Sequence, residues 1–241
     1  MDAIRIENLR KEYKDVVAVD NLSLTVRKGE LFSLLGVNGA GKTTVIKMLS
    51  CLTMPTSGDA FLNGNSILKD SASVKSILAV SPQETAVASG LTVLENLKLM
   101  CGIYEFDKDK TNIKIAELTE LLGLESVLKR KAGKLSGGWQ RRLSIAMALI
   151  SEPEILFLDE PTLGLDVIIR SELWDLIRSL KGVVTIVLTT HYMEEAEALS
   201  DRIAIMKDGK LLICDTAENI KKTAGTDKFE QAFISIVKGD V

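Results

Sequence analysis

A glycine-rich segment between an apolar run and a helical pattern constrains the fold of this chain more than any other feature. The segment, Gly36-Val-Asn-Gly-Ala-Gly-Lys-Thr43, follows Leu31-Phe-Ser-Leu-Leu35, an apolar run typical of a strand covered on both faces. A helix is predicted from Lys42 to Leu52, because apolar residues there can share one face. The spacing G-x-x-x-x-G-K-[ST] between a buried strand and a helix is the pattern of a phosphate-binding loop.

The residue types in this loop suit a polyphosphate. Glycine lets the backbone curl, so that successive N–H groups and the helix N-terminus face one anion. Lys42 adds a full positive charge for the terminal phosphates, and Thr43 offers a hydroxyl ligand to Mg²⁺. A glycine-rich turn that only caps a helix is the alternative, which the strand before and the helix after disfavour. The predicted ligand is a nucleoside triphosphate, although the loop alone does not separate kinases, GTPases and ATPases.

Composition excludes several other classes of protein. The 241 residues include 30 Lys plus Arg and 33 Asp plus Glu, which gives a formal net charge of −3, and 5 % are aromatic. The slightly acidic balance and the few aromatic residues argue against a nucleic-acid partner. Cys51, Cys101 and Cys214 form no pair suited to a disulfide framework or zinc site, so we expect a reducing cytoplasm. No signal-peptide pattern and no apolar run near the roughly 20 residues of a spanning helix is present, so any membrane role is expected to act through a partner.

Apolar periodicity divides the chain into three parts. Alternation from Ala3 to Val26 predicts half-buried strands. Residues 82–150 hold the helix-length segments Thr92 to Cys101, Asn112 to Leu122 and Ser136 to Ser151. From Ile155 to Ser200 strands and helices alternate, which is typical of a parallel sheet, and Asp208-Gly209 then predicts a hairpin. The expected fold class is α/β, a P-loop NTPase core with a mixed sheet, an N-terminal antiparallel β subdomain and an inserted α-helical subdomain. We expect one domain over 1–241, with core and β subdomain in 1–81 and 151–241 and the helical subdomain in 82–150.

Two adjacent carboxylates end another predicted buried strand, Ile155 to Leu158. In phosphoryl transfer an acid at such a strand end can hold Mg²⁺ opposite the loop threonine, the role predicted for Asp159. Glu160 would face the attacking water and accept its proton as a general base. Either acid could instead cap the next element, an alternative that the phosphate loop weakens.

His191 is the only histidine, and it follows the predicted strand Thr185 to Leu188 by three residues. A lone histidine is often structural, but ligands of open α/β sheets bind at the carboxyl ends of strands. We therefore predict that its imidazole contacts the γ-phosphate and orients the attacking water.

The order of these motifs resembles that of the nucleotide-binding subunits of ABC transporters along almost the whole chain. The decisive segment, Lys134-Leu-Ser-Gly-Gly-Trp-Gln-Arg141, is similar to the LSGGQ signature of that family, with Trp139 where glutamine is common. Ser136 and two glycines at the start of a predicted helix would form a second anion-binding cap. An ordinary Ser N-cap also fits, but it would not require the glycines, which are poor helix formers.

The resemblance implies further roles. Tyr13 would stack on adenine, although a half-buried aromatic at a strand edge is the alternative reading. Gln83 would be a ligand of Mg²⁺ and water that joins the core to the helical subdomain. Leu163-Gly-Leu-Asp166 is similar to the D-loop of the family, with Leu163 where serine is frequent.

Together these patterns assign three sets of residues. Catalysis is assigned to Glu160 and His191, and Mg²⁺ to Thr43, Gln83 and Asp159. ATP is assigned to Tyr13, Gly36, Asn38, Gly39, Ala40, Gly41, Lys42, Thr43, Thr44, Gln83, Ser136, Gly137 and Gly138.

The resemblance also implies partners and a location. Two copies would sandwich two ATP molecules head to tail, and a separate membrane permease would dock near Gln83 and Glu84 to Thr92. The subunit would then be cytoplasmic and peripheral on the inner face of the cell membrane. Gly90 to Leu97 and the ending from Phe229 resemble ABC-2-type export systems of the drug-resistance and sodium-export branch. An importer subunit, a soluble ABC-type ATPase acting on ribosomes or DNA, and a small-molecule kinase are the alternatives, of which the kinase does not explain the signature.

Overall fold

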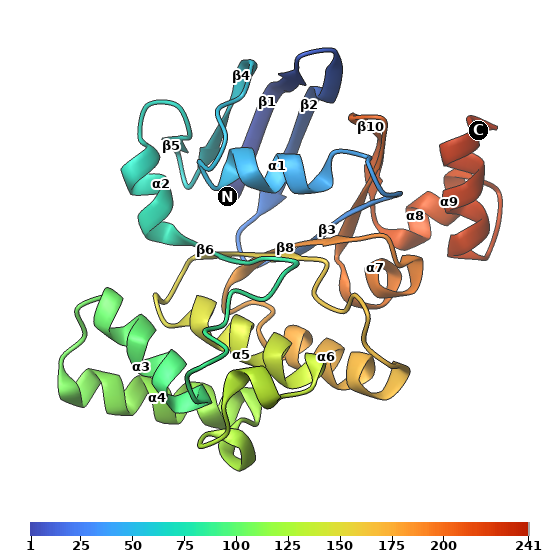
Figure 1. The fold of residues 1–241 in the computed structure, drawn as a ribbon. Helices are drawn as coiled ribbons and strands as arrows, with labels where there is room; N and C mark the ends of the chain where they lie inside the picture. Colours follow the sequence, from blue (N-terminus) through green and yellow to red (C-terminus); the bar gives the residue numbers. More distant parts are fainter. Residues whose placement is uncertain (241) are drawn as a thin grey trace.

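In the computed structural model, which describes residues 1–240, two sheets and a layer of helices stack on one another (Figure 1). The first sheet, in the order β2-β1-β4-β5, is antiparallel throughout. The second has the order β10-β9-β3-β8-β7-β6, with β10 antiparallel at one edge and the other pairs parallel. The predicted mixed sheet and the antiparallel β subdomain are confirmed.

The strands are β1 (Asp2–Tyr13), β2 (Val16–Arg27), β3 (Leu31–Gly36), β4 (Ser57–Leu62), β5 (Asn65–Ser66), β6 (Leu78–Ser81), β7 (Ile155–Asp159), β8 (Thr185–Thr190), β9 (Arg202–Lys207) and β10 (Lys210–Asp215). The helices are α1 (Lys42–Leu49), α2 (Ser71–Ile77), α3 (Val93–Ile103), α4 (Lys108–Leu122), α5 (Gly137–Leu149), α6 (Val167–Ser179), α7 (Met193–Leu199), α8 (Ala217–Thr223) and α9 (Phe229–Lys238). Within residues 1–240, no helix combines the length and the apolar character needed to cross a membrane.

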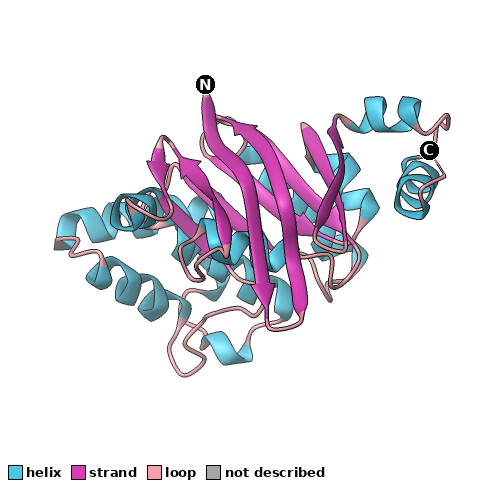
Figure 2. Cartoon of the chain, turned by 90° about the horizontal axis from the view of Figure 1, so that it is seen from above, coloured by secondary structure: helices cyan, strands magenta, loops and turns pink. Residues whose placement is uncertain are grey.

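The parallel strands are buried on both faces, which explains their continuous apolar runs. Every residue of β3, β7 and β8 is buried. Successive side chains of a strand point to opposite faces, so Leu156 and Leu158 join the core beneath the helices, whereas Ile155 and Phe157 join the core beneath the first sheet. Seen from above, the strands gather in the middle of the molecule and the C-terminal helices lie at its side (Figure 2).

The helical layer is built from α3, α4 and α5, which lie below the second sheet in Figure 1. A capping box of Thr92 and Glu95 starts α3. Asp107 caps α4, which begins at Lys108, four residues before the predicted start at Asn112, because a side-chain cap can begin a helix where apolar periodicity is still absent. The segment Ser57 to Ile77 holds β4, β5 and α2, which periodicity did not predict; these elements are short and half-exposed.

A partly buried ion pair ties the two sheets together. Arg202, at the start of β9, donates from Nε to Glu30 Oε1 at 2.7 Å and from Nη2 to Glu30 Oε2 at 3.0 Å. The same Nη2 donates to the carbonyl of Thr25 on β2 at 2.7 Å, and Glu30 also accepts from the backbone N–H of Arg27 at 2.6 Å. Glu30 is buried, and its hydrogen bonds and charge raise the pKa of Arg202. The carboxylate of Glu30 is therefore bound by two parallel N–H donors, an arrangement that a guanidinium can supply and an ammonium cannot.

We expect Arg202→Lys to destabilise the protein by about 2 kcal/mol, because an ammonium cannot reproduce the paired contacts to Glu30 and the bond to Thr25. Urea unfolding followed by circular dichroism measures this loss. Arg178→Lys is the matched control, since Arg178 forms an exposed pair with Asp175 on α6, and it should change the free energy of unfolding by less than about 0.5 kcal/mol. Equal effects of the two variants would contradict the role given to Arg202.

Candidate active site

The candidate site lies where β3, β7 and β8 end at one edge of the second sheet. Parallel strands carry their carboxyl ends to the same edge, where open α/β sheets bind ligands. The strands end at Gly36, Asp159 and Thr190, and His191 follows β8 directly instead of by the predicted three residues, because the strand continues to Thr190. A cleft of about 600 Å³ opens there, and it is lined by Val16, Val17, Ala18, Asn38, Gly39, Ala40, Gly41, Lys42, Thr43, Thr44, Gln83, Glu160, Leu163, His191 and Asp208.

Glycine is required in the phosphate loop for steric reasons. Gly41 precedes α1 with φ +101°, and a Cβ atom there would overlap the carbonyl oxygen of Ala18 on β2. A Cβ on Gly36 would overlap the carbonyl oxygen of Met206 on β9. In addition, Gly209 in the β9–β10 turn donates its N–H to the carbonyl of Ala40 at 3.2 Å. The loop is thus held by β2 and by the hairpin as well as by its own helix.

The ammonium of Lys42 lies inside this loop and is buried. It donates to the carbonyl of Gly36 at 2.7 Å and to that of Val37 at 3.4 Å. Its Nζ also lies 3.4 Å from Glu160 Oε1. Glu160 therefore neutralises the positive charge that the loop offers to a phosphate.

The backbone conformation of Glu160 places one carboxylate oxygen near Lys42 and the other near His191. Its φ of 48° is unusual for a residue with a side chain, and its N–H is shared between the carbonyl and the hydroxyl of Thr189, each at 3.1 Å. Oε2 lies 2.7 Å from His191 Nδ1. Since an ionised carboxylate can only accept, we place the ring hydrogen on Nδ1, which leaves Nε2 as the second functional nitrogen of His191.

Oxygen atoms suited to Mg²⁺ lie beside this pair. Asp159 is buried at the end of β7, and its Oδ1 accepts from the hydroxyl of Thr43 at 3.3 Å and from that of Thr189. Gln83 lines the same cleft. A carboxylate, a hydroxyl and an amide oxygen are ligands of the hard type that Mg²⁺ takes, so the donor set fits the ion.

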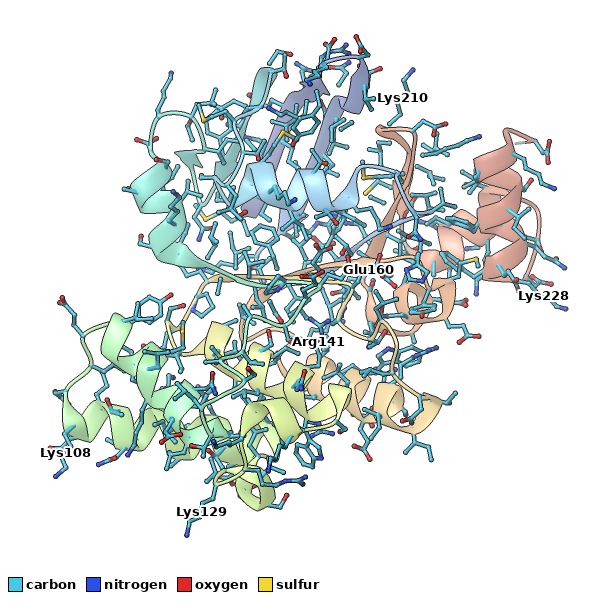
Figure 3. All side chains as sticks on the ribbon, viewed as in Figure 1. Lys108, Lys129, Arg141, Glu160, Lys210 and Lys228 are labelled. Atoms are coloured by element: carbon cyan, nitrogen blue, oxygen red, sulfur yellow. The ribbon has the colours of Figure 1, made fainter. Side chains whose placement is uncertain are left out.

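Arg141 was not singled out from the sequence, yet it positions Gln83. It lies on α5 and donates from Nη1 to the carbonyl of Pro82 and from Nη2 to the carbonyl of Gln83, each at 2.6 Å. Burial lowers the pKa of this guanidinium, while the charges of Asp159 and Glu195 act in the opposite direction. In Figure 3, Arg141 and Glu160 lie in the middle of the molecule, with Arg141 below Glu160.

Some predicted ATP ligands lie outside this cleft. Tyr13 ends β1 with 45 % of its surface exposed, and Lys11 Nζ lies 4.8 Å from the centre of its ring. Ser136, Gly137 and Gly138 are at the start of α5 and do not line the cleft. Ser136 occupies the N-cap position, but within residues 1–240 its side chain makes no capping hydrogen bond. A Cβ on Gly138 would overlap Ile169 on α6, so this glycine has a packing role that the sequence did not reveal.

Several cleft residues were missed by reasoning from the sequence. Val16, Val17 and Ala18 come from β2, and Asp208 comes from the β9–β10 turn. The pattern Asp208-Gly209 was read only as a hairpin signal. Nothing in local periodicity indicates that this hairpin packs against the phosphate loop, because that contact depends on the pairing of β9 with β3.

The cleft at the strand ends combines a phosphate loop, two acids and a histidine, and an antiparallel sheet and a helical layer flank the sheet that carries it. These features define the class of P-loop nucleoside triphosphatases. Comparison with known proteins narrows the class. The family model for ABC transporters matches residues 19–163, and the chain belongs to this family. Its enzymatic activity is therefore ATP hydrolysis, and within an ABC transporter it is the ATP-binding subunit.

Individual relatives agree with this assignment. The doxorubicin resistance ATP-binding protein DrrA of Mycobacterium tuberculosis is 40 % identical over 99 % of this chain and 72 % of its own length. A probable multidrug ABC transporter ATP-binding protein, YbhF of Escherichia coli, is 39 % identical over 97 % of this chain and 41 % of its own length. A solved dimeric ATP-binding cassette in a post-hydrolysis state, bound to ADP and Pi, is 27 % identical over 88 % of this chain and 98 % of that chain, with a TM-score of 0.79.

We expect Gly41→Ala to weaken ATP binding by about tenfold or more, because the new methyl group must displace either the loop or β2. Fluorescence titration with a labelled ATP analogue measures the affinity. The matched control is Gly102→Ala within α3, where a Cβ would meet open space in the described chain. The control should bind ATP like the parent and gain about 0.5–1 kcal/mol of stability. If Gly41→Ala also binds like the parent, the loop is not the phosphate site.

Proposed function

We propose that this chain is the ATPase subunit of an exporter of drug-like molecules, with Glu160 as general base and His191 as the group that orients the attacking water. The observation that carries the hydrolytic part is the contact of Glu160 with both Lys42 and His191 in one cleft. When the phosphates of ATP enter the loop, their negative charge competes with Glu160 for the ammonium of Lys42. A Glu160 carboxylate released from Lys42 is free to accept a proton from water, while its contact with His191 keeps it oriented.

Mg²⁺ is proposed to bind Thr43, Gln83 and Asp159 together with the phosphates. When bound, the ion neutralises charge that develops on the phosphate oxygens. The loop residues Asn38, Gly39, Ala40 and Thr44 line the cleft beside Lys42, which supports their assignment as ATP-binding residues. Tyr13 is proposed to stack on adenine from its exposed position at the end of β1.

A second copy of the chain is proposed to complete each site. Ser136, Gly137 and Gly138 lie outside the cleft of their own chain, and the hydroxyl of Ser136 is not used as a cap. Those features suit a group that binds a nucleotide held by another subunit. The dimeric arrangement of the related cassette solved with ADP and Pi supports this proposal.

The membrane permease is proposed to dock on an apolar groove between the second sheet and the helical layer. The groove has a volume of about 260 Å³ and includes Leu78, Met100, Tyr104 and Ala148. Ala86, within the segment expected to receive the partner, also lines the groove, as does Pro82 next to Gln83. The names of DrrA and YbhF, which refer to drug resistance and multidrug transport, support export as the direction and drug-like molecules as the substrate class.

The same proposal gives the location and the moving parts. The subunit would lie on the inner face of the cell membrane, held there by its permease. Residues 82–150 would move as a helical subdomain relative to the core formed by 1–81 and 151–241. The packing of α3, α4 and α5 into one layer supports this division.

We expect Glu160→Gln to bind ATP with near-parental affinity and to accumulate as a dimer, while turnover falls by about a hundredfold or more, because the amide cannot accept the proton. Release of phosphate measures turnover, and size-exclusion chromatography with ATP measures dimerisation. Glu172→Gln is the matched control, since Glu172 forms a half-exposed pair with Arg142. Parental turnover in Glu160→Gln would remove Glu160 as the base.

Transport is tested by purifying the tagged chain from native membranes and identifying what accompanies it. We expect a multispanning membrane protein, and we expect vesicles containing the complex to move doxorubicin outward only with ATP. Ile103→Asp with Tyr104→Asp should release the permease and leave ATP binding intact, since both residues are exposed and Tyr104 lines the groove. Ile113→Asp, an exposed position on α4, is the control. Copurification with ribosomes or DNA instead would favour the soluble ABC-type ATPase, and inward movement would favour an importer.

A further inference from the structure

Two neighbouring segments behind the cleft are joined by several side-chain contacts. One segment runs from Glu160 into α6, and the other runs from His191 into α7; α6 and α7 lie side by side (Figure 1). The contact of Glu160 with His191 is the first link. The second and third links converge on Glu195 of α7, whose Oε1 accepts from the hydroxyl of Thr162 at 2.8 Å and from the ring N–H of Trp174 at 3.0 Å.

Glu195 is a fully buried hydrogen-bond acceptor. None of its surface is exposed. Oε2 has no hydrogen-bond partner among residues 1–240. Burial raises the pKa of this carboxyl; the donated hydrogen bonds oppose the shift, and the nearby charge of Glu160 adds to it.

The loop between the two anchoring donors is exposed and reaches the cleft. Thr162 is fully buried, whereas Leu163 is 37 % exposed and lines the cleft. Asp166 then caps α6 through the N–H groups of its first turn, and Trp174 lies two turns further along the same helix. Glu195 therefore binds the polypeptide on both sides of the loop 163–166 and connects it to the segment that begins with His191.

We propose that Glu195 is a positioning residue for ATP hydrolysis, which holds the loop 163–166 and α6 in register with His191. This inference rests on the proposed roles of Glu160 and His191. Thr162 lies two residues after Glu160, and Glu195 lies four residues after His191. The contacts Glu160–His191 and Thr162–Glu195 therefore join the same two segments at neighbouring positions. Loss of the hydrogen bonds of Glu195 lets the segment that carries His191 shift relative to Glu160, while the phosphate loop stays unchanged.

Side-chain chemistry predicts which substitutions are tolerated. Glutamine at position 195 keeps an oxygen acceptor of the same reach, so Glu195→Gln should retain both donated bonds. Aspartate is one methylene shorter and should lose at least one of them. Alanine leaves the hydroxyl of Thr162 and the ring N–H of Trp174 without their partner.

The experiment combines steady-state kinetics with a spectroscopic signal from His191. We expect Glu195→Ala to lower kcat by about tenfold, with KM for ATP within about twofold of the parent, and Glu195→Gln to stay within about twofold in both. Because the chain contains one histidine, the imidazole resonances in an NMR spectrum report on His191 alone. They should shift in Glu195→Ala but not in Glu194→Ala, which alters an exposed residue of the same helix.

A double-variant cycle tests the route of the effect. Thr162→Val removes the donor and keeps the branched shape of the side chain. It should lower kcat like Glu195→Ala, and the double variant should be no slower than either single variant. Parental kcat and unshifted His191 resonances in Glu195→Ala would overturn the proposal, as would a fully additive loss. If Glu195→Ala does not fold, Thr162→Val and Glu195→Asp provide the same tests. If Glu160→Gln hydrolyses ATP normally, the proposed function itself fails, whatever the Glu195 variants do.

Discussion

The structure depends on the neutralisation of one buried cation, the ammonium of Lys42. The phosphate loop folds its N–H groups and this ammonium toward an anion, and such a concentration of positive charge is costly without a counter-ion. Glu160 supplies that counter-ion from the end of β7, which β8 separates from β3 in the sheet, and His191 contacts its second oxygen. Glu160 is therefore both a structural partner of the loop and the proposed base. Entry of a nucleotide exchanges one anion for another at the same cation.

Long-range polar contacts link this charge centre to the rest of the molecule. Arg141 joins α5 to the backbone of Pro82 and Gln83, Arg202 joins the two sheets, and Glu195 joins α7 to the polypeptide that follows Glu160. Each of these side chains makes at least two hydrogen bonds, which gives directional attachment where apolar packing gives none. Movement of the helical layer can therefore reach Gln83, and movement of the exposed loop 163–166 can reach His191.

Prediction from the sequence succeeded where local pattern and local structure coincide. The buried strands β3, β7 and β8 are short and mostly apolar, and the Asp208-Gly209 turn closes a hairpin, so both were recognisable from neighbouring residues. Boundaries failed where a side-chain cap, such as Asp107 at α4, starts a helix before apolar periodicity begins. The segment from β4 to α2 was missed because its elements are short and half-exposed and carry little periodic signal.

The sequence by itself determined the chemistry: the glycines and Lys42 of the phosphate loop, the acids at the end of β7, and the order of motifs that places the chain in its family. Only the tertiary structure decided which of these groups touch. Three of these contacts join residues far apart along the chain: Lys42 with Glu160, Arg141 with the carbonyl of Gln83, and Glu195 with Thr162. Such contacts follow from strand order and helix packing, which no local pattern encodes, whereas a phosphate loop needs only consecutive residues with the right backbone freedom.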